Sequence, residues 1–234
     1  MEWDEIGSVL TVVAHPDDAE FGSAGTAAKL AKDGKEVFYA IVTDGSKGSS
    51  DPDMTPERLS ALRREEQCEA ARRTGVADVA FLDFPDGMLE PNLELRKAIA
   101  AVIRAYKPDV VICQNPNREF SFNVFAQHPD HLACGEATLA AIYPTARDRL
   151  TFPELLDQGL EPHAVSEVWV SGGPQPDFFV DITDTIETKI AALGAHASQV
   201  DIEQIGERIR DRARSVGREG GCEYAEAFRR LRMR

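Results

Sequence analysis

Residues 9–20 of this 234-residue chain read VLTVVAHPDDAE, an apolar run that ends abruptly in one imidazole and three carboxylates. The run lacks the alternation of polar and apolar residues that marks a strand with one face in water. Continuous apolar runs of this length are typical of strands in a parallel sheet, which helices cover on both faces. We therefore predict a buried strand over residues 10–14, followed at once by a polar turn.

The first half of the chain repeats this alternation of apolar runs and helical patterns. Further strands are predicted over residues 37–43, 79–82 and 110–113, with helices over residues 25–33, 56–74 and 93–106. A glycine stands in the helix-stop position after each of the first two helices, and a proline follows the third. Strand–helix–strand repetition predicts right-handed crossovers and an α/β fold with a Rossmann-like, mostly parallel sheet flanked by helices.

The second half is less regular. It predicts a helix over residues 129–141, strands over 168–170 and 178–180, an amphipathic helix over 185–197, and a last long helix marked by Ile205, Ile209, Ala213 and Val216. The final 27 residues, from Arg208, carry nine arginines and four acids, and we interpret them as a solvated helix face that balances the acidic body. No shift in composition marks a boundary, so residues 1–234 are predicted to form a single domain.

Composition excludes several classes of function. The formal net charge of −14 argues against non-specific nucleic-acid binding, which needs a basic surface. No apolar run approaches the ~20 residues of a membrane span, and the acidic first residues do not look like a secretory signal. The four cysteines have long, irregular spacings and read as reduced packing residues. We therefore expect a cytoplasmic protein in which any metal is held by histidine and carboxylate.

Two polar groups follow predicted strands, where open α/β sheets bind their ligands. The first holds His15, Asp17, Asp18 and Glu20, and the second is QHPDH at residues 127–131. The two histidines of the second group are three residues apart, so both can face one side of a helix start. Two histidines and one carboxylate are what zinc takes in hydrolytic sites, with a fourth position left for water. The pattern predicts one divalent cation, zinc, with Fe²⁺ as the alternative.

Further short motifs accompany these two groups. They are Thr43-Asp44-Gly45, Arg63-x-x-Glu66, Gly75-Val76, Pro85-Asp86-Gly87, Lys189, His196-x-Ser198-Gln199 and Tyr224-Ala-Glu-Ala-Phe228. With Ala-His-Pro-Asp-Asp-x-Glu and His-Pro-Asp-His in this order, the chain resembles the PIG-L/LmbE-type N-deacetylases over almost its whole length. That family removes N-acetyl groups from glucosamine-containing substrates.

The resemblance implies roles at the first motif and at the end of the second. His15, Asp18 and His131 are expected to be the metal ligands. Asp17 is expected to be the general base that deprotonates the metal-bound water. Because Asp17 and Asp18 are adjacent, they project in different directions, so one can bind the metal while the other faces the water.

The resemblance also implies roles around the substrate. His128, held by Asp130, is expected to stabilise the oxyanion or to protonate the leaving amine, and a pKa raised by Asp130 would keep it positively charged. Arg63 is expected to contact the substrate or the intermediate. Glu20 is expected to orient a neighbour of the metal or to serve as a helix-start acid.

Two features concern the walls of the pocket. The loop over residues 115–127 is longer than in the simplest members of the family and should form one wall. Its Phe120, Phe122 and Phe125 would either stack on a sugar or an aglycone, or pack the loop down. His196 would either line the pocket or be a packed or capping residue.

The sequence thus predicts a zinc-dependent hydrolase that removes an acetyl group from the nitrogen of a small amino-sugar substrate. One alternative is an amidase that acts on a thiol conjugate or another non-sugar N-acyl amine. Another is a metal-binding module without catalysis. The chain has no GxSxG motif for a serine hydrolase and no GxGxxG for a dinucleotide. The resemblance further implies a homo-oligomer.

Overall fold

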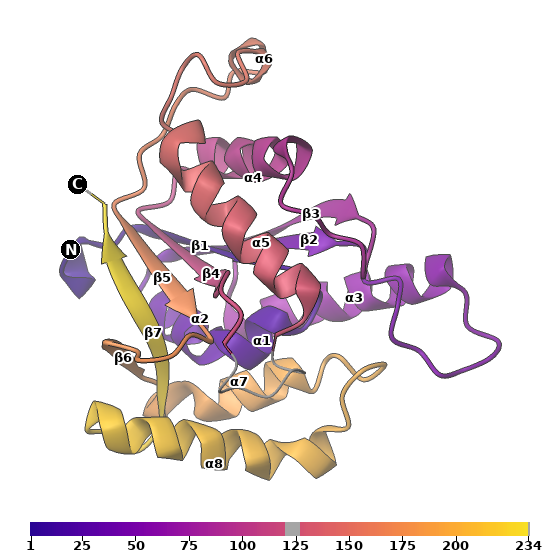
Figure 1. The fold of residues 1–234 in the computed structure, drawn as a ribbon. Coiled ribbons are helices and arrows are strands. Elements are labelled where there is room, and N and C mark those ends of the chain that lie inside the picture. The colour runs from indigo at the N-terminus through magenta and orange to yellow at the C-terminus, as the bar shows by residue number, and fades with distance from the viewer. Residues whose placement is uncertain (120–126, 234) are drawn as a thin grey trace.

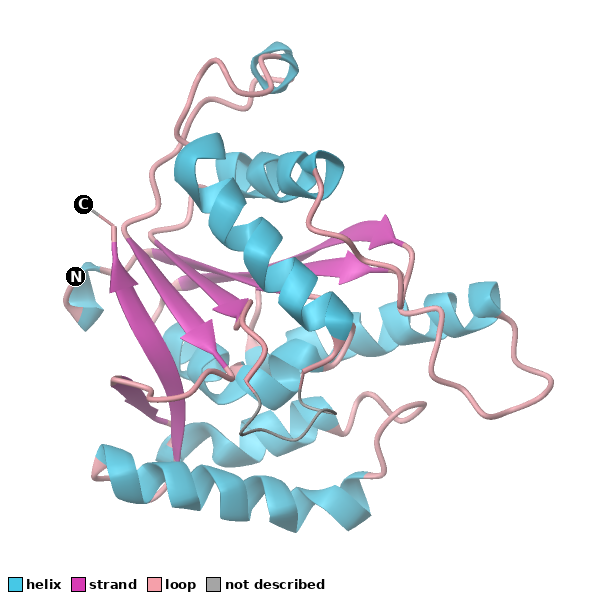
Figure 2. Ribbon diagram, viewed as in Figure 1, coloured by secondary structure: helices cyan, strands magenta, loops and turns pink. Residues whose placement is uncertain are grey.

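The computed structural model describes residues 1–119 and 127–233. Seven strands form one sheet in the order β3-β2-β1-β4-β5-β7-β6, with helices on both faces (Figures 1 and 2). The strands are β1 (Ser8–Val13), β2 (Glu36–Thr43), β3 (Asp78–Phe84), β4 (Val110–Gln114), β5 (Glu167–Ser171), β6 (Phe178–Asp181) and β7 (Ala225–Arg232). Strands β1 to β5 run parallel, and β7 is antiparallel to both of its neighbours. The predicted α/β fold with a mostly parallel sheet is confirmed.

The helices divide between the two faces of the sheet (Figure 1). They are α1 (Asp18–Gly22), α2 (Ala24–Lys32), α3 (Pro56–Thr74), α4 (Leu93–Tyr106), α5 (Pro129–Ala140), α6 (Glu154–Asp157), α7 (Ile186–Leu193) and α8 (Ile202–Gly220). The side chains of successive β1 residues point alternately to the two faces of the sheet. Leu10 belongs to the core that α4 and α5 cover, and Val9 belongs to the core under α2 and α7. Burial on both faces explains the continuous apolar run that opens the chain.

The order of the strands places the ends of β1 and β4 side by side. From β1 the chain moves outward to β2 and β3, then returns to pair β4 with the other edge of β1. The loops after β1 and β4 therefore leave in opposite directions, and such a switch point is where open α/β sheets bind ligands. Helix α5 lies tightly over this point, because a Cβ added at Gly135 would come within 2.3 Å of the Gln114 carbonyl oxygen.

Two expectations about the second half and the cysteines are wrong in part. The final 27 residues do not continue as a helix face: β7 inserts between β5 and β6, and its Phe228 is fully buried. Arginines are interspersed among the apolar residues of β7, so the hydropathy pattern did not indicate a strand there. Cys113 and Cys134 pack in the core as predicted, whereas Cys68 is exposed on α3. Across the described residues, no helix is both long and apolar enough to cross a bilayer.

Candidate metal centre and active-site cleft

The loop after β1 turns sharply at Asp17. This residue has φ 93° and ψ −26°, a left-handed conformation that costs roughly 1–2 kcal/mol for most residues and less for Asp. The turn separates two adjacent carboxylates. Asp18 points toward His15 and His131, whereas Asp17 Oδ2 lies 3.3 Å from a terminal nitrogen of Arg63. Asp17 and Asp18 therefore point in different directions, as expected.

Three side chains from the two loops converge on one point. His15 Nδ1 lies 3.2 Å from His131 Nε2 and 3.2 Å from Asp18 Oδ2, and His131 Nε2 lies 3.1 Å from Asp18 Oδ1. Ligand atoms at zinc distances with tetrahedral angles stand about 3.4 Å apart. Two nitrogens and a carboxylate that face each other so closely fit a shared cation.

The far side of the His15 ring is held by acids. Its Nε2 lies 3.1 Å from Asp130 Oδ2 and 3.2 Å from Asp86 Oδ1. Asp130 is itself fixed by the backbone N–H groups of Gly87, at 2.7 Å, and Leu89, at 3.2 Å. Burial opposes a charge on His15, but the surrounding carboxylates outweigh it and raise its pKa to about 12. The carboxylates hold the proton on Nε2, and a bound cation would displace the proton from Nδ1.

Two other sets of described side chains come close enough to share a cation. They are His15 with His128 and His131, and His15 with Asp86 and Asp130. In the first set, His128 Nδ1 already accepts the backbone N–H of Asp130 at 3.2 Å, as the cap of α5. In the second, both oxygens of Asp130 accept backbone N–H groups, whereas Asp18 accepts one only at Oδ2 and turns Oδ1 toward His131. The set formed by His15, Asp18 and His131 therefore fits a cation best, and Asp18 and His131 also line the cleft.

The predicted partnership of His128 and Asp130 is wrong in its chemistry. The Asp130 carboxylate bonds His15 and the backbone N–H groups of Gly87 and Leu89. The contact between Asp130 and His128 is instead a hydrogen bond from the Asp130 backbone N–H to His128 Nδ1. Burial and the nearby charge of His15 lower the pKa of His128, and the opposing effect of Asp130 is smaller. The expected raised pKa is thus contradicted. With Nδ1 accepting a hydrogen bond, a neutral His128 carries its proton on Nε2.

Arg63 occupies a different place from the one expected. Its side chain is 5% exposed, and its terminal nitrogens donate to the Pro16 carbonyl at 2.7 Å and the Gly45 carbonyl at 3.2 Å. Further bonds go to Lys47 O and to the Asp17 carboxylate. These contacts hold the β1 loop, so the structure does not support a direct substrate contact by Arg63.

The remaining polar residues of the loop are buried. Glu20 and His196 are each 0% exposed and lie 3.2 Å apart, so His196 does not line the cleft. Gln67, which no sequence motif singled out, bonds both Glu20 and the Asp17 backbone. Burial and the Asp18 charge raise the pKa of Asp17 to about 7, although Arg63 opposes this.

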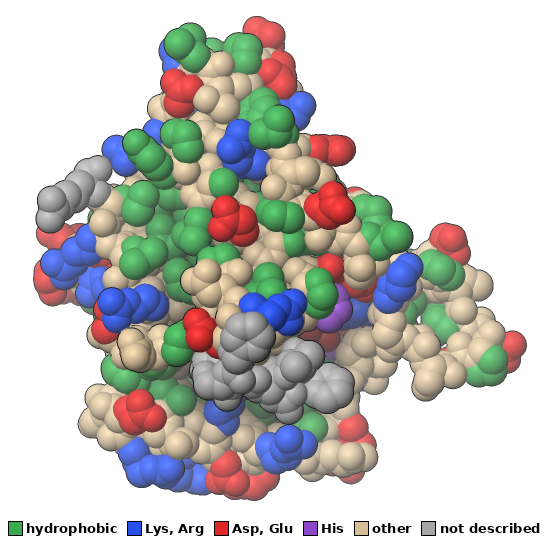
Figure 3. Space-filling view, viewed as in Figure 1, with side chains coloured by type: hydrophobic (Ala, Val, Ile, Leu, Met, Phe, Trp, Pro, Cys, Tyr) green, Lys and Arg blue, Asp and Glu red, His purple; other side chains and the backbone are tan. Residues whose placement is uncertain are grey.

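A cleft of about 580 Å³ opens over the converged side chains. Asp17, Asp18 and His131 line one end of it, and histidine surface is visible beside acidic side chains in the space-filling view (Figure 3). α8 and β7 form another wall, in which Arg212 and Glu226 lie among the apolar residues Ile209, Ala213, Val216, Ala225 and Ala227. Asn115, Asn117 and Gln127 also line it, so the described ends of the 115–127 loop form a wall as predicted. Phe120, Phe122 and Phe125 lie outside the described residues.

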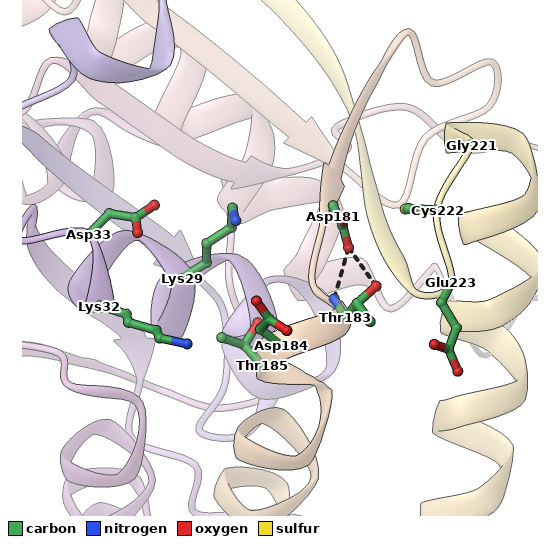
Figure 4. A pocket seen from close by; sticks show the side chains of 10 residues that line it. All are labelled: Lys29, Lys32, Asp33, Asp181, Thr183, Asp184, Thr185, Gly221, Cys222 and Glu223. Atoms are coloured by element: carbon green, nitrogen blue, oxygen red, sulfur yellow. Dashed lines mark hydrogen bonds between the residues drawn. The ribbon is translucent and has the colours of Figure 1, made fainter.

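A second hollow, of about 520 Å³, is a poorer candidate. Lys29 and Lys32 of α2 face Asp181 and Glu223 across it, and Asp181 is hydrogen-bonded to Thr183 (Figure 4). Its lining, as far as the structure describes it, holds no histidine, and its two lysines lie among four acids. The chemistry of the described residues is therefore concentrated in the first cleft.

Asp130→Asn tests the support of His15. The variant is expected to weaken metal binding by about 10- to 100-fold, the usual effect of losing a carboxylate behind a histidine ligand. Competition with a chromogenic chelator measures the affinity. Asp109→Asn is the matched control, because Asp109 also accepts two backbone N–H groups but lies far from His15 along β4. Equal affinities for Asp130→Asn and the native protein would contradict the assignment.

Comparison with known proteins agrees with this geometry. The family model of PIG-L, GlcNAc-PI de-N-acetylase, matches residues 10–142. Diacetylchitobiose deacetylase of Thermococcus kodakarensis is 33% identical over 97% of this chain and 84% of its own length. A probable N-acetyl-alpha-D-glucosaminyl L-malate deacetylase 2 of Bacillus subtilis is 28% identical over 87% of this chain and 89% of its own length.

The solved structures agree as well. The structure of N,N'-diacetylchitobiose deacetylase from Pyrococcus horikoshii superposes with a TM-score of 0.90 at 31% identity, and the match covers 98% of this chain and 85% of that one. These relatives bear the names of deacetylases, which confirms the predicted enzyme class. The chain belongs to the PIG-L family of metal-dependent N-deacetylases.

Proposed function

We propose that residues 1–234 act as one deacetylase domain that hydrolyses the N-acetyl amide of a small molecule containing N-acetylglucosamine, with one zinc ion held by His15, Asp18 and His131. The observation that carries the proposal is the convergence of these three side chains, 3.1–3.2 Å apart, at the cleft end beside Asp17. The relatives named above support the reaction class, since they are deacetylases of diacetylchitobiose and of N-acetylglucosaminyl malate.

Asp17 and His128 act on different atoms of the reacting water and amide. Bound zinc supplies a Lewis acid, which lowers the pKa of the attacking water and polarises the amide carbonyl. Asp17 Oδ2 is occupied by Arg63, so Oδ1 is the atom that takes the proton of the water. Neutral His128 donates a hydrogen bond from Nε2 to the carbonyl oxygen, and the proton that Asp17 took from the water passes to the leaving amine. One such donor is worth about 3 kcal/mol in a site without bulk water.

The cleft suits an amino sugar that carries a second group. Its volume of about 580 Å³ lies within the usual range for small-molecule sites. The polar end holds Asp17 and the predicted ligands Asp18 and His131, and the exposed Asn117 offers an amide suited to sugar hydroxyls. The amides of Asn115 and Gln127 bond the backbone of their own loop and shape the wall. The wall formed by α8 and β7, largely apolar but with Arg212 and Glu226 in it, would accommodate the next sugar ring or an aglycone.

Removal of metal tests this proposal directly. Exhaustive chelation is expected to lower the release of acetate from N-acetylglucosamine and diacetylchitobiose by about 100-fold or more, and stoichiometric zinc should restore it. Amine release is measured by fluorogenic derivatisation, with an N-acetylated thiol conjugate in the same panel. Reconstitution with Fe²⁺ under anaerobic conditions compares the two metals. Turnover of none of these substrates by the metal-loaded protein would contradict a deacetylase, and turnover of the thiol conjugate alone would contradict the sugar.

A further inference from the structure

Three fully buried polar side chains adjoin the loop that carries Asp17. Gln67 comes from α3, Glu20 from α1 and His196 from the segment after α7, and each is 0% exposed. Gln67 Nε2 donates to Glu20 Oε1 at 3.1 Å, and His196 Nε2 lies 3.2 Å from Glu20 Oε2. At the other end, Gln67 Oε1 accepts the backbone N–H of Asp17 at 3.1 Å. None of the three lines the cleft, so none is placed to touch a substrate.

The direction of this chain of hydrogen bonds is fixed by its end. The Asp17 N–H can only donate, so Gln67 must turn its carbonyl oxygen toward it and its amide nitrogen toward Glu20. The Glu20 carboxylate accepts that bond, and its second oxygen accepts the Nε2–H of His196. His196 Nδ1 has no hydrogen-bond partner among the described residues, so the ring is held through Nε2. Each side chain thus restricts the next, and the series ends on one backbone amide.

The amide in question belongs to the residue whose backbone conformation separates the two aspartates. We propose that Gln67, held by Glu20 and His196, is a positioning residue that keeps Asp17 left-handed. It thereby aims the Asp17 carboxylate at the cleft while Asp18 faces His15 and His131. The inference rests on the proposed function, because it assumes that Asp17 acts on the substrate. Gln67 acts only through Asp17 and is not itself catalytic.

Two variants of Gln67 test the inference. Gln67→Leu removes the acceptor, and Gln67→Glu keeps an acceptor but sets a second carboxylate against Glu20. Each is expected to lower kcat by about 10- to 100-fold, with KM changed less than about threefold and the metal content unchanged. Glu66→Gln is the matched control: Glu66 ties the same helix to Ser198 by two bonds of 2.7 Å without touching Asp17. Its kcat should stay within about twofold of the native value.

Restoring the direction of the hydrogen bonds should restore the rate. In the double variant Gln67→Glu with Glu20→Gln, the carboxylate again accepts from Asp17, and the amide lies between it and His196. Its kcat is expected to recover to within about threefold of the native enzyme. A crystal structure of Gln67→Leu should show Asp17 outside the left-handed region or in two conformations, a readout independent of turnover.

Several results would overturn the inference. Among them are native kcat in Gln67→Leu, an equal loss of kcat in Glu66→Gln, and an unchanged Asp17 backbone in the Gln67→Leu crystal. A double variant no faster than Gln67→Glu would do the same, and if Gln67→Leu does not fold, this comparison decides alone. Failure of the proposed function would look different, since the native protein itself would then release no acetate while the backbone readout remained measurable.

Discussion

Asp17→Asn is expected to lower kcat for acetate release by about 10²- to 10⁴-fold while the protein keeps its full complement of metal. The amide cannot take a proton from water, whereas its oxygen can still accept the hydrogen bond from Arg63. Asparagine also tolerates the left-handed backbone that residue 17 adopts, so the loop should keep its shape. The loss should fall on the chemical step, and KM should change little.

The measurement compares kcat with the metal content of the same sample, determined by atomic emission. Asp83→Asn is the matched control, because Asp83 is another aspartate with positive φ, at 56°, but is exposed and bonded to Arg64 outside the cleft. A kcat within tenfold of the native value in Asp17→Asn would rule out Asp17 as the base. A loss of metal in the same variant would show instead that the residue supports the ligands.

The sequence predicted the parts of the site that depend on local order. His15 and Asp18 follow the last residue of β1 by two and five residues, and His131 lies in the first turn of α5, which begins at Pro129. Strand ends and helix starts are encoded by neighbouring residues, so their positions could be read from spacing and hydropathy. The parallel sheet then brings the end of β1 next to the loop after β4.

The contacts that cross between elements could not be predicted in the same way. Asp130 was expected beside His128, its near neighbour in sequence, yet its carboxylate turns across to His15 and to the β3–α4 loop. Arg63 was expected to reach a substrate, but its guanidinium donates to backbone carbonyls of the loops after β1 and β2, against which α3 packs. Gln67 gave no signal because one buried amide has no spacing pattern. Such roles depend on which elements pack together in the tertiary structure and on where each side chain then points.

Glu167→Gln is expected to lower the free energy of unfolding at pH 7 by about 3 kcal/mol, without changing the kcat of the folded enzyme. Glu167 is 1% exposed at the start of β5. Its oxygens accept from Arg230 of β7 at 2.7 and 2.8 Å, from the indole of Trp169 at 3.1 Å and from the Met1 amine at 2.6 Å. Burial opposes its charge, but these donors outweigh burial and hold its pKa at about 2, against 4.5 ordinarily. At about 1.4 kcal/mol per pKa unit, that difference gives the expected loss.

The sign of the pH dependence follows from the lowered pKa. The folded protein binds the proton on Glu167 less readily than the unfolded chain does, so the stabilisation is complete above about pH 5. It is lost as the pH falls from about 4.5 to about 2. Urea unfolding of the native protein and Glu167→Gln should therefore give curves that are well separated at pH 7 and approach each other toward pH 2. Glu161→Gln is the control, because its pair with Arg149 is exposed and contributes less than about 1 kcal/mol. A gap between the native and Glu167→Gln proteins that stayed constant down to pH 2 would mean that the lost stability comes from packing rather than from the charge shared by β5 and β7.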